Sequence, residues 1–307
     1  MSGVSNKQKF ILGTFGIVAL IFIFLIIGFI IINSFSSLFQ EKCVAEVDIE
    51  YPLTVDGMPA TLMSEGYPSS EEIATKIREL NTRDDVAAVL FVFNSEGGST
   101  VATKEVYDSM KDLKKPKVAY FREVAASGAY YAATSADYIV AEPYALTGSI
   151  GVIATVVSMS GLFEKIGINA TSVTSGKHKD IGSPFREMSE EEQSIMKAIV
   201  DEVFQDFKKV VIENRKGKIN MARADEIFDG RIVTGKQAKE LGLVDAIGGK
   251  RDAIIKAAEL GGIKNKKPED IRICKIEART ESNPLFGATS FIHGLSEKLP
   301  STGIYFK

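Results

Sequence analysis

Apolar residues recur along the chain in short blocks that predict alternating strands and helices. The run from Val86 to Phe93 is continuously apolar, as in a strand buried on both faces of a parallel sheet. Shorter strands are predicted at residues 44–53, 117–121, 138–141 and 170–174. Helical spacing of apolar residues predicts helices over 99–113, 129–134, 221–228, 236–241 and 250–260. The alternation of the two kinds of element predicts an α/β fold.

Two polar clusters mark the starts of further helices. Ser69 to Glu72 and Ser189 to Glu192 each have the capping-box pattern, a serine followed three residues later by a glutamate. The first cluster precedes Ile73, Ile77 and Leu80 at helical spacing. The second opens a long amphipathic helix that is predicted to end near Arg215. One stripe of that helix contains Ile195, Ile199, Val203 and Phe207.

The N-terminal part of the chain contains a candidate membrane anchor. Residues 10–32 carry no charge and are almost all apolar, and at about 1.5 Å per residue such a helix crosses a hydrocarbon core of about 30 Å. Lys7 and Lys9 precede it, which predicts a cytoplasmic N-terminus with everything after residue 33 on the extracytoplasmic side. A cleaved signal peptide is the alternative, but its apolar core is usually shorter. We therefore expect a single-pass protein of the cell membrane.

Composition narrows the function without deciding it. The 307 residues are 45% hydrophobic and 25% charged, which is ordinary for a globular protein, and the net charge of −3 gives no reason to expect a nucleic acid partner. Cys43 and Cys274 are too few for a disulfide framework or a four-cysteine metal site, and the sequence does not say whether they meet. Because His178 and His293 are the only histidines, a histidine-rich metal site is excluded.

The strongest candidate for chemistry is a serine among small residues. Ser127 stands between the predicted strand at 117–121 and the predicted helix at 129–134. A strand-to-helix turn projects the hydroxyl, and the Gly128 amide near the helix N-terminus is available to hold an anion. This arrangement predicts a nucleophile with half an oxyanion hole. A tightly packed helix start would show the same short pattern, so the motif needs support from elsewhere in the chain.

A serine nucleophile needs a base within hydrogen-bond reach, and one polar loop offers two. Lys179 and His178 are neighbours in the segment from Ser175 to Asp180. A lysine can act as a base only if its pKa is lowered from about 10.4 by burial or by nearby cations. Neighbouring residues on an extended segment point to opposite sides, so we expect only one of the two to face Ser127. A Ser127-Lys179 dyad and a Ser127-His178-Asp180 triad both remain open at this stage.

Five motifs, in the same order and at the same spacing, resemble one family. They are residues 94–98, 126–131, 146–152, 175–184 and 229–238. The stretch from about Val86 to Gly249 resembles the signal peptide peptidases of the SppA type, membrane-anchored serine peptidases with a Ser-Lys dyad. The resemblance implies a Clp-protease/crotonase-like fold of repeated ββα units, preceded by one N-terminal transmembrane helix. It also implies a homo-oligomeric ring in which neighbouring subunits contribute to each site.

The resemblance also implies a role for each site residue. Ser127 matches the nucleophile, and Lys179 matches the general base. Ser149 matches the serine that hydrogen-bonds the lysine and helps to keep it neutral. The amides of Gly98 and Gly128 match the oxyanion hole. No metal or cofactor is implied.

The chain departs from the family pattern at two positions. Glu96 stands where the family usually has a proline, and Ala129 stands where it usually has a second glycine. Neither change removes a catalytic group. Glu96 adds a carboxylate near the expected path of the substrate, so we expect acidic residues near the scissile bond to be disfavoured.

The expected organisation follows from these observations. The parts are a cytoplasmic N-terminus at 1–9, a transmembrane anchor at 10–32, a linker at 33–43, a Ser-Lys peptidase domain at 44–275 and a C-terminal tail at 276–307. The expected function is an endopeptidase that degrades cleaved signal peptides or other short apolar peptides through an acyl-enzyme. The alternatives are a related membrane-linked peptidase with a specific membrane-protein target and a non-catalytic membrane scaffold of the same fold. An acyl-CoA hydratase fits less well, because it would need no membrane anchor.

Overall fold

The computed structural model describes residues 23, 26, 27, 41–60, 66–264, 267–277 and 305–306. Contacts divide the chain into two units, Met1–Lys42 and Cys43–Lys307, and the second unit contains the fold considered below. Apart from residues 23, 26 and 27, the anchor expected over 10–32 lies outside the described residues, as do residues 33–40 of the expected linker. Within the described ranges, no helix combines the length and the apolar character needed to cross a membrane.

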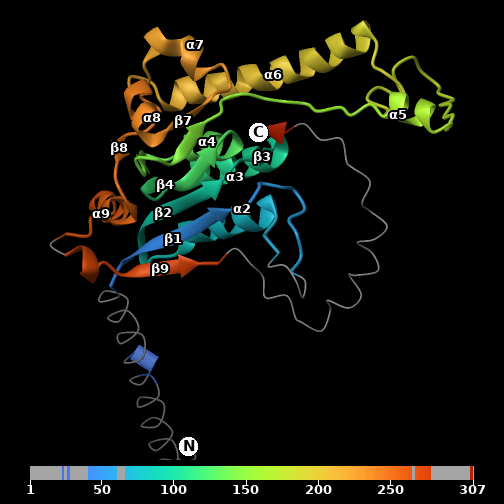
Figure 1. Cartoon of the computed structure of the whole chain (residues 1–307). Helices are drawn as coiled ribbons and strands as arrows, with labels where there is room; N and C mark the ends of the chain where they lie inside the picture. The colour runs from blue at the N-terminus through green and yellow to red at the C-terminus, as the bar shows by residue number, and fades with distance from the viewer. Residues whose placement is uncertain are drawn as a thin grey trace, which may run out of the picture. The chain divides into compact units, whose positions relative to one another are not determined.

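Strands and helices alternate through the second unit (Figure 1). The strands are β1 (Cys43–Glu50), β2 (Val86–Ser95), β3 (Gly98–Ser99), β4 (Lys117–Ala126), β5 (Tyr138–Ala141), β6 (Leu146–Gly148), β7 (Ile232–Thr234), β8 (Ala246–Ile247), β9 (Ile273–Ile276) and β10 (Tyr305–Phe306). The α-helices are α2 (Ser70–Glu79), α3 (Thr100–Asp112), α4 (Gly128–Ala133), α5 (Ser160–Lys165), α6 (Glu190–Asn214), α7 (Ala224–Ile227), α8 (Gly235–Leu241) and α9 (Lys250–Leu260). The 3₁₀ helices are η1 (Leu80–Thr82), η2 (Met221–Arg223) and η3 (Pro268–Asp270).

The main sheet is almost entirely parallel, with strand order β7-β6-β4-β2-β1-β9. Strand β4 is shared between two neighbours, because its residues Val118–Phe121 pair with β5 whereas its residues Val124–Ala126 pair with β6. Strand β8 extends the β5 branch, and β7 is antiparallel to β6. The division of β4 directs its last residues, and the turn that follows them, toward β6.

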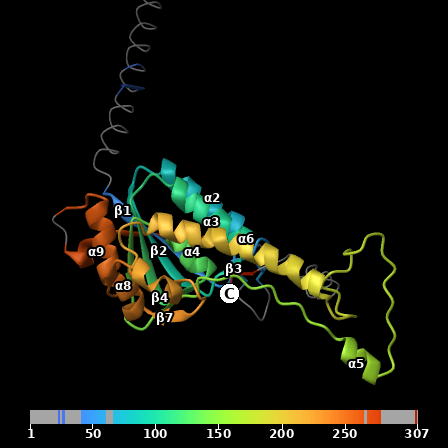
Figure 2. The same ribbon diagram turned by 90° about the horizontal axis from the view of Figure 1, so that it is seen from above.

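The continuous apolar run of β2 is explained by burial on both faces. Successive side chains of a strand point to opposite faces, so Val89 and Phe91 join the core under α2, α3 and α4, whereas Leu90 and Val92 join a second core under α9. Figure 2 shows α9 on one side of the sheet and α2 and α3 on the other. The α/β class predicted from the sequence is confirmed.

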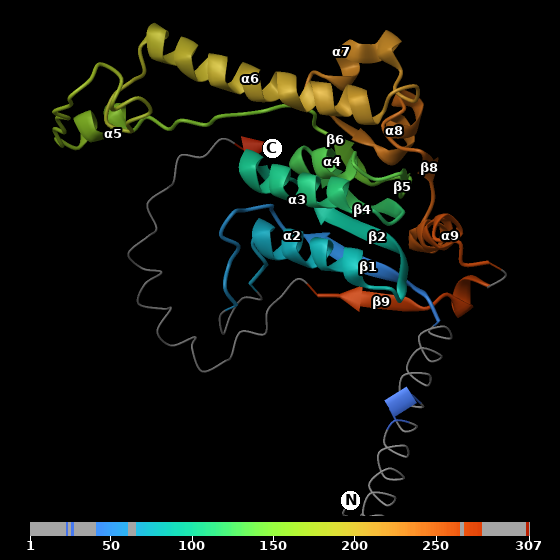
Figure 3. The same cartoon turned by 180° about the vertical axis from the view of Figure 1, so that it is seen from behind.

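Residues 153–199 form an arm that extends away from the sheet. The chain leaves β6, runs beside α6 to α5 at the far end, and returns through α6 to the core (Figures 1 and 3). The apolar residues of α6 that are buried, Phe207 and Val211, lie toward its C-terminal end. The arm carries exposed apolar side chains, among them Val157, Leu162, Ile166, Ile168 and Val173.

The arm differs from the sequence predictions at residues 170–174 and along the apolar stripe of α6. Residues 170–174, predicted as a strand, lie in this region without strand structure, and Val173 is 97% exposed. An alternating pattern becomes a strand only beside a partner strand, and the arm offers none in its described residues. The apolar stripe on α6 is buried only toward its C-terminal end, since Ile195 and Ile199 are 37% and 38% exposed. The capping boxes at Ser69 and Ser189 are both confirmed.

A disulfide joins the two cysteines across the edge of the sheet. Cys43 begins β1, Cys274 lies in β9, and their Cα atoms are 5.9 Å apart. The bond closes a loop of 231 residues in sequence separation, which restricts the unfolded chain strongly. It therefore ties the last described strand of the sheet to the first.

We predict that replacing both cysteines with serine (Cys43→Ser, Cys274→Ser) lowers the free energy of unfolding by about 2–4 kcal/mol, because the unfolded chain regains loop entropy. Urea denaturation of the full chain in detergent measures this. The wild type with reductant should match the variant, and reductant should not change the variant. An unchanged denaturation midpoint in both comparisons would contradict the prediction.

Candidate active site

Ser127 occupies a strained turn between β4 and α4. Its backbone has φ 52° and ψ −120°, a left-handed conformation that is uncommon for a residue other than glycine. Two hydrogen bonds hold the turn. The Ser127 amide donates to the Gly148 carbonyl at 2.9 Å, and the Ser127 carbonyl accepts from the Tyr131 amide at 2.9 Å. Strand β6 and the first turn of α4 thus fix the conformation from both sides.

The Ser127 hydroxyl has no hydrogen-bond partner among the described residues. The residue is fully buried, and burying a hydroxyl without a partner costs free energy. Such an exception in a well-packed region points to a group that is completed by something else. We expect the partner of this hydroxyl to be a base, a substrate or both.

Two glycines between the end of β2 and the start of β3, Gly97 and Gly98, lie directly beside this turn. Gly97 has φ +104°, and a Cβ placed on it would be 2.6 Å from the Gly128 nitrogen. Leu53 bonds both neighbours of Gly98, because its amide donates to the Gly97 carbonyl at 2.7 Å and its carbonyl accepts from the Ser99 amide at 2.9 Å. Backbone groups alternate along an extended strand, so the Gly98 amide faces the opposite edge. The Gly98 and Gly128 amides therefore lie next to one another beside Ser127.

Thr103 is a residue of this site that the sequence did not reveal. It is fully buried in α3, and its Oγ1 has no partner among the residues that the structure describes. A Cβ on Gly128 would lie 2.3 Å from that Oγ1 and 3.2 Å from the Gly98 nitrogen. The hydroxyl therefore explains why position 128 requires glycine. Nothing in the pattern of α3 distinguishes Thr103 from an ordinary buried helix residue.

Ser149 lies at the end of β6, one residue after the carbonyl that binds Ser127. It is also in a left-handed conformation, with φ 50°, and its amide donates to the Arg231 carbonyl at 2.8 Å. Because Gly148 is paired with Ala126, the two serines follow neighbouring strands at the same level of the sheet. The structure thus brings together four of the five predicted site residues: Ser127, Ser149, Gly98 and Gly128.

The free edge of β3 holds a short antiparallel strand from the C-terminus. In β10, Tyr305 pairs with Ser99 and Phe306 pairs with Gly98 (Figure 1). The edge beside the paired glycines therefore accepts an extended peptide backbone.

Lys179 lies far from Ser127 in the same chain. Its side chain is exposed and makes no hydrogen bond or ion pair with the described residues. Its loop is bound to Glu191 at the start of α6, whereas α6 reaches α4 at Phe207, whose ring is 5.2 Å from that of Tyr131. Sixteen residues of helix separate Glu191 from Phe207, a length of about 24 Å. The Lys179 amine therefore does not reach the Ser127 hydroxyl of its own chain.

His178, the rival base, is also held away from Ser127. Its Nε2 is 3.4 Å from Glu191 Oε1, and its Nδ1 is 3.8 Å from Glu192 Oε1. Asp180, the third member of the possible triad, is bound by Arg186 instead. The three residues of the Ser127-His178-Asp180 arrangement are therefore not brought together within the chain.

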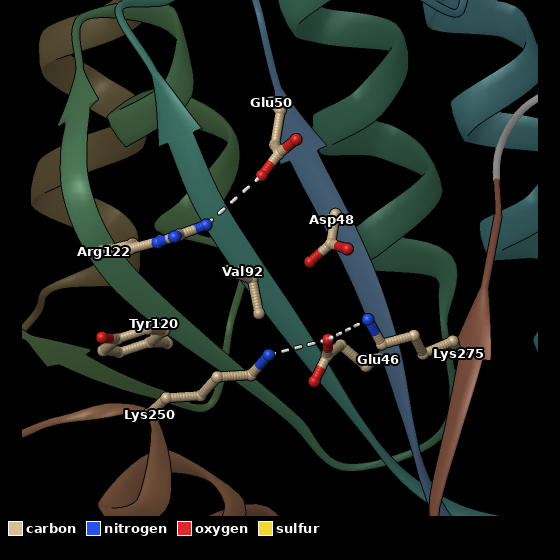
Figure 4. Close-up of a pocket in the computed structure, with 8 residues that line it drawn as sticks. All are labelled: Glu46, Asp48, Glu50, Val92, Tyr120, Arg122, Lys250 and Lys275. Atoms are coloured by element: carbon tan, nitrogen blue, oxygen red, sulfur yellow. Dashed lines mark hydrogen bonds and ion pairs between the residues drawn. The ribbon is translucent and has the colours of Figure 1, made fainter.

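A polar groove of about 410 Å³ lies elsewhere on the sheet and contains none of the predicted site residues (Figure 4). Glu46, Asp48 and Glu50 line it from β1, opposite Lys250 and Arg122. Lys250 Nζ lies 2.8 Å from Glu46, and Arg122 lies 3.7 Å from Glu50. Partial desolvation and the two neighbouring carboxylates raise the pKa of Asp48. The groove balances its own charges and gives no sign of a reaction centre.

In the described ranges, the group of residues close enough to share a metal ion is Cys43, Asp85 and Cys274. Both sulfur atoms belong to the disulfide, so they are not free thiolate ligands. This donor set does not fit a metal while the disulfide is formed.

Known proteins of similar sequence identify the family of this chain. The family model described as peptidase family S49 matches residues 109–264, and that described as Clp protease matches residues 65–147. A predicted protease of Methanocaldococcus jannaschii is 40% identical over 216 residues, which cover 70% of this chain and 67% of that protein. The chain belongs to peptidase family S49.

Two further relatives support this membership. A predicted signal peptide peptidase of Enterococcus faecium is 36% identical, over 66% of this chain and 60% of its own length. The chloroplastic serine protease SPPA of Arabidopsis thaliana is 32% identical, over 75% of this chain but only 34% of its own length. The protein is thus a serine peptidase with a Clp-protease-like domain, as its sequence motifs indicated. This S49 chain spans between about a third and two thirds of these relatives.

We predict that Gly128→Ala lowers the kcat of this S49 peptidase by about 100-fold or more, because the added methyl displaces one amide of the oxyanion hole. Peptide hydrolysis by the full chain in detergent measures the loss. Replacing Thr103 with alanine in the same chain should restore part of the rate, since Thr103 Oγ1 is the nearest obstacle at 2.3 Å. A Gly128→Ala enzyme with wild-type kcat would show that this amide is not used.

Proposed function

We propose that the protein is a membrane-anchored serine endopeptidase that uses a Ser-Lys dyad to hydrolyse cleaved signal peptides or other short apolar peptides. The observation that carries the proposal is the buried hydroxyl of Ser127, which has no partner among the described residues and lies beside the adjacent amides of Gly98 and Gly128. A nucleophile next to two backbone donors is the arrangement that acyl transfer requires.

The reaction runs in two acyl-transfer steps. Neutral Lys179 takes the Ser127 proton while the serine oxygen attacks the peptide carbonyl, and the amides of Gly98 and Gly128 hold the resulting oxyanion. Each such donor contributes about 2.7–4 kcal/mol to catalysis in comparable sites. The protonated lysine then delivers its proton to the leaving amine. Water attacks the acyl-enzyme while Lys179 accepts a water proton. The protonated lysine then returns that proton to Ser127 Oγ as the peptide acid leaves.

The lysine comes from a neighbouring copy of the chain. The helix length of about 24 Å between the Lys179 loop and the core argues against a dyad within one chain. The apolar side chains along the arm, such as Leu162, Ile166 and Ile168, are exposed in the single chain and become buried when the arm lies against another copy. A head-to-tail contact of this kind generates a ring when it closes. Each ring position then combines Ser127 of one copy with Lys179 of the next.

The catalytic domain lies on the extracytoplasmic side of the membrane, anchored by residues 10–32. The uncharged N-terminal segment and the lysines before it support this orientation. The Cys43–Cys274 disulfide adds support, because disulfides persist mainly in oxidising compartments. The disulfide begins only eleven residues after the expected end of the anchor.

The substrate binds as an extended strand along β3. The pairing of β10 with Ser99 and Gly98 supports this mode, since a peptide at the same edge would bring its carbonyl to the Gly98 amide. A short apolar peptide is favoured because one relative is named a signal peptide peptidase, and signal peptides have an apolar core.

We predict that Ser127→Ala and Lys179→Ala are each inactive alone but regain activity when the two full-length variants are co-expressed. In a mixed ring, about a quarter of the sites combine an intact serine with an intact lysine from the next copy, so about a quarter of the wild-type rate should return. Hydrolysis of a fluorogenic apolar peptide measures this.

Separately purified variants mixed after assembly serve as the control and should stay inactive. His178→Ala should retain most of the wild-type rate. An inactive co-expressed mixture would argue for a dyad within one chain, whereas an inactive His178→Ala together with an active Lys179→Ala would assign the base to histidine.

We also predict that deleting residues 305–307 lowers the KM for peptide substrates several-fold and leaves kcat unchanged. A tethered segment competes at millimolar effective concentration for the edge of β3, so its removal frees that edge. Adding back a synthetic peptide of residues 303–307 should inhibit the deletion variant competitively. If the deletion leaves KM unchanged, substrates do not use this edge.

A further inference from the structure

The loop that carries Lys179 is held to the start of α6 by the residues on either side of that lysine. Lys177 is paired with Glu191, and His178 lies against Glu191 and Glu192. Asp180 is bound by Arg186. Of the four consecutive residues 177–180, only Lys179 has a side chain without a partner in the described part of the chain. The surrounding contacts therefore leave this amine free to act elsewhere.

Arg186 is the centre of these contacts. Its guanidinium binds Asp180 through two hydrogen bonds, Nε to Oδ2 at 2.8 Å and Nη2 to Oδ1 at 2.7 Å. It also binds Glu192 through two hydrogen bonds, Nη1 to Oε2 at 2.7 Å and Nη2 to Oε1 at 2.6 Å. A planar guanidinium with several fixed donors matches two carboxylates at once in a way that an ammonium group cannot.

Glu192 links this arrangement to the helix. Its side chain is only 4% exposed, and it closes the capping box by accepting from the Ser189 amide at 3.0 Å. The bonds to Arg186 and to the Ser189 backbone lower the pKa of Glu192 to about 2, so it remains charged at neutral pH. Arg186 therefore connects Asp180, directly after the lysine, to a fixed position at the first turn of α6.

We propose that Arg186 is a positioning residue for Lys179: it fixes the lysine loop on α6 and holds the Asp180 carboxylate away from the lysine amine. This inference rests on the proposed role of Lys179 as the base. The resemblance and the comparisons assign no role to Arg186.

The electrostatic reason concerns the charge state that a basic lysine needs. An uncompensated carboxylate beside an amine stabilises the protonated form, which cannot accept a proton. Asp180 is the next residue along the chain, and the Arg186 bonds lower the pKa of Asp180, so its negative charge is permanent at neutral pH. Binding that charge to a guanidinium prevents an Asp180–Lys179 ion pair.

The other ionisable side chains near Lys179 already have partners. Lys177 and His178 face Glu191, and Glu192 is bound by Arg186. Glu187 accepts from Ser158 at 2.7 Å, a hydroxyl from the segment before α5. In the proposed ring, the neighbouring copy presents the uncharged Ser127 and Ser149 to the lysine. Asp180 is thus the carboxylate whose release would change the lysine environment most.

The test is the pH dependence of kcat for full-length variants in detergent. Arg186→Gln should move the acidic limb of the profile upward by about one pH unit and lower kcat at pH 7 by about tenfold, with KM within about twofold of wild type. Arg186→Lys keeps the charge but not the paired geometry and should give an intermediate profile. Adding Asp180→Asn to Arg186→Gln should return the limb to its wild-type position, because the freed carboxylate is then absent.

A matched control is Arg223→Gln, which removes another arginine with two bonds to one carboxylate, Glu226, at 2.7 Å each. It should leave the pH profile unchanged. The inference is overturned if Arg186→Gln loses activity with no movement of the limb, or if Asp180→Asn fails to reverse the movement, since either outcome reduces Arg186 to a structural role. Failure of the proposed function looks different, because Lys179→Ala would then retain activity.

Discussion

The contacts at the C-terminal end of α6 fix the position of the arm, and therefore the position of Lys179. Arg215 follows the last residue of the helix, is only 1% exposed, and donates to Asp245 at 2.8 Å and to the Gly242 carbonyl. Asn214 donates to Tyr107 in α3 at 3.0 Å and to Thr134 after α4 at 2.9 Å. A buried guanidinium is costly unless it is fully paired, and here the pairing makes one end of α6 part of the core. The N-terminal end of α6 can then extend away from the core as a rigid helix.

Helix α6 separates the serine turn from Lys179. The serine and its two amides lie where β4 leads into α4 and where β3 follows β2, and strand pairing fixes both places. Lys179 lies on the arm, where Arg186 binds its loop to the first turn of α6. Within one chain, the serine turn is therefore fully formed while Lys179 remains out of its reach. In the proposed ring, hydrolysis depends on assembly and occurs only where copies of the chain meet.

Some elements could be predicted from sequence because their causes are local. Capping boxes at Ser69 and Ser189 depend on four residues each, and the apolar run of β2 is long enough to signal burial on both faces. The glycines and Ser127 could be predicted as a group because the small side chains are themselves the requirement. The strand expected at 170–174 was wrong because a strand also needs a neighbour, and its residues are placed on the arm. The distance between Ser127 and Lys179 has no sequence signal, since it depends on the direction in which α6 leaves the core. The role of Thr103 depends on one contact with Gly128 across two helices.

Two residues at the serine turn have strained backbones that are held by backbone hydrogen bonds. Ser127 and Ser149 are both left-handed, and each such residue costs on the order of 1–3 kcal/mol. They are coupled, because the Gly148 carbonyl that binds the Ser127 amide immediately precedes Ser149, whose own amide is bound by the Arg231 carbonyl. These bonds hold the turn through the backbone alone, so neither hydroxyl is needed to maintain it. The Ser127 hydroxyl can therefore remain without a partner among the described residues and form a hydrogen bond with the group that completes the site.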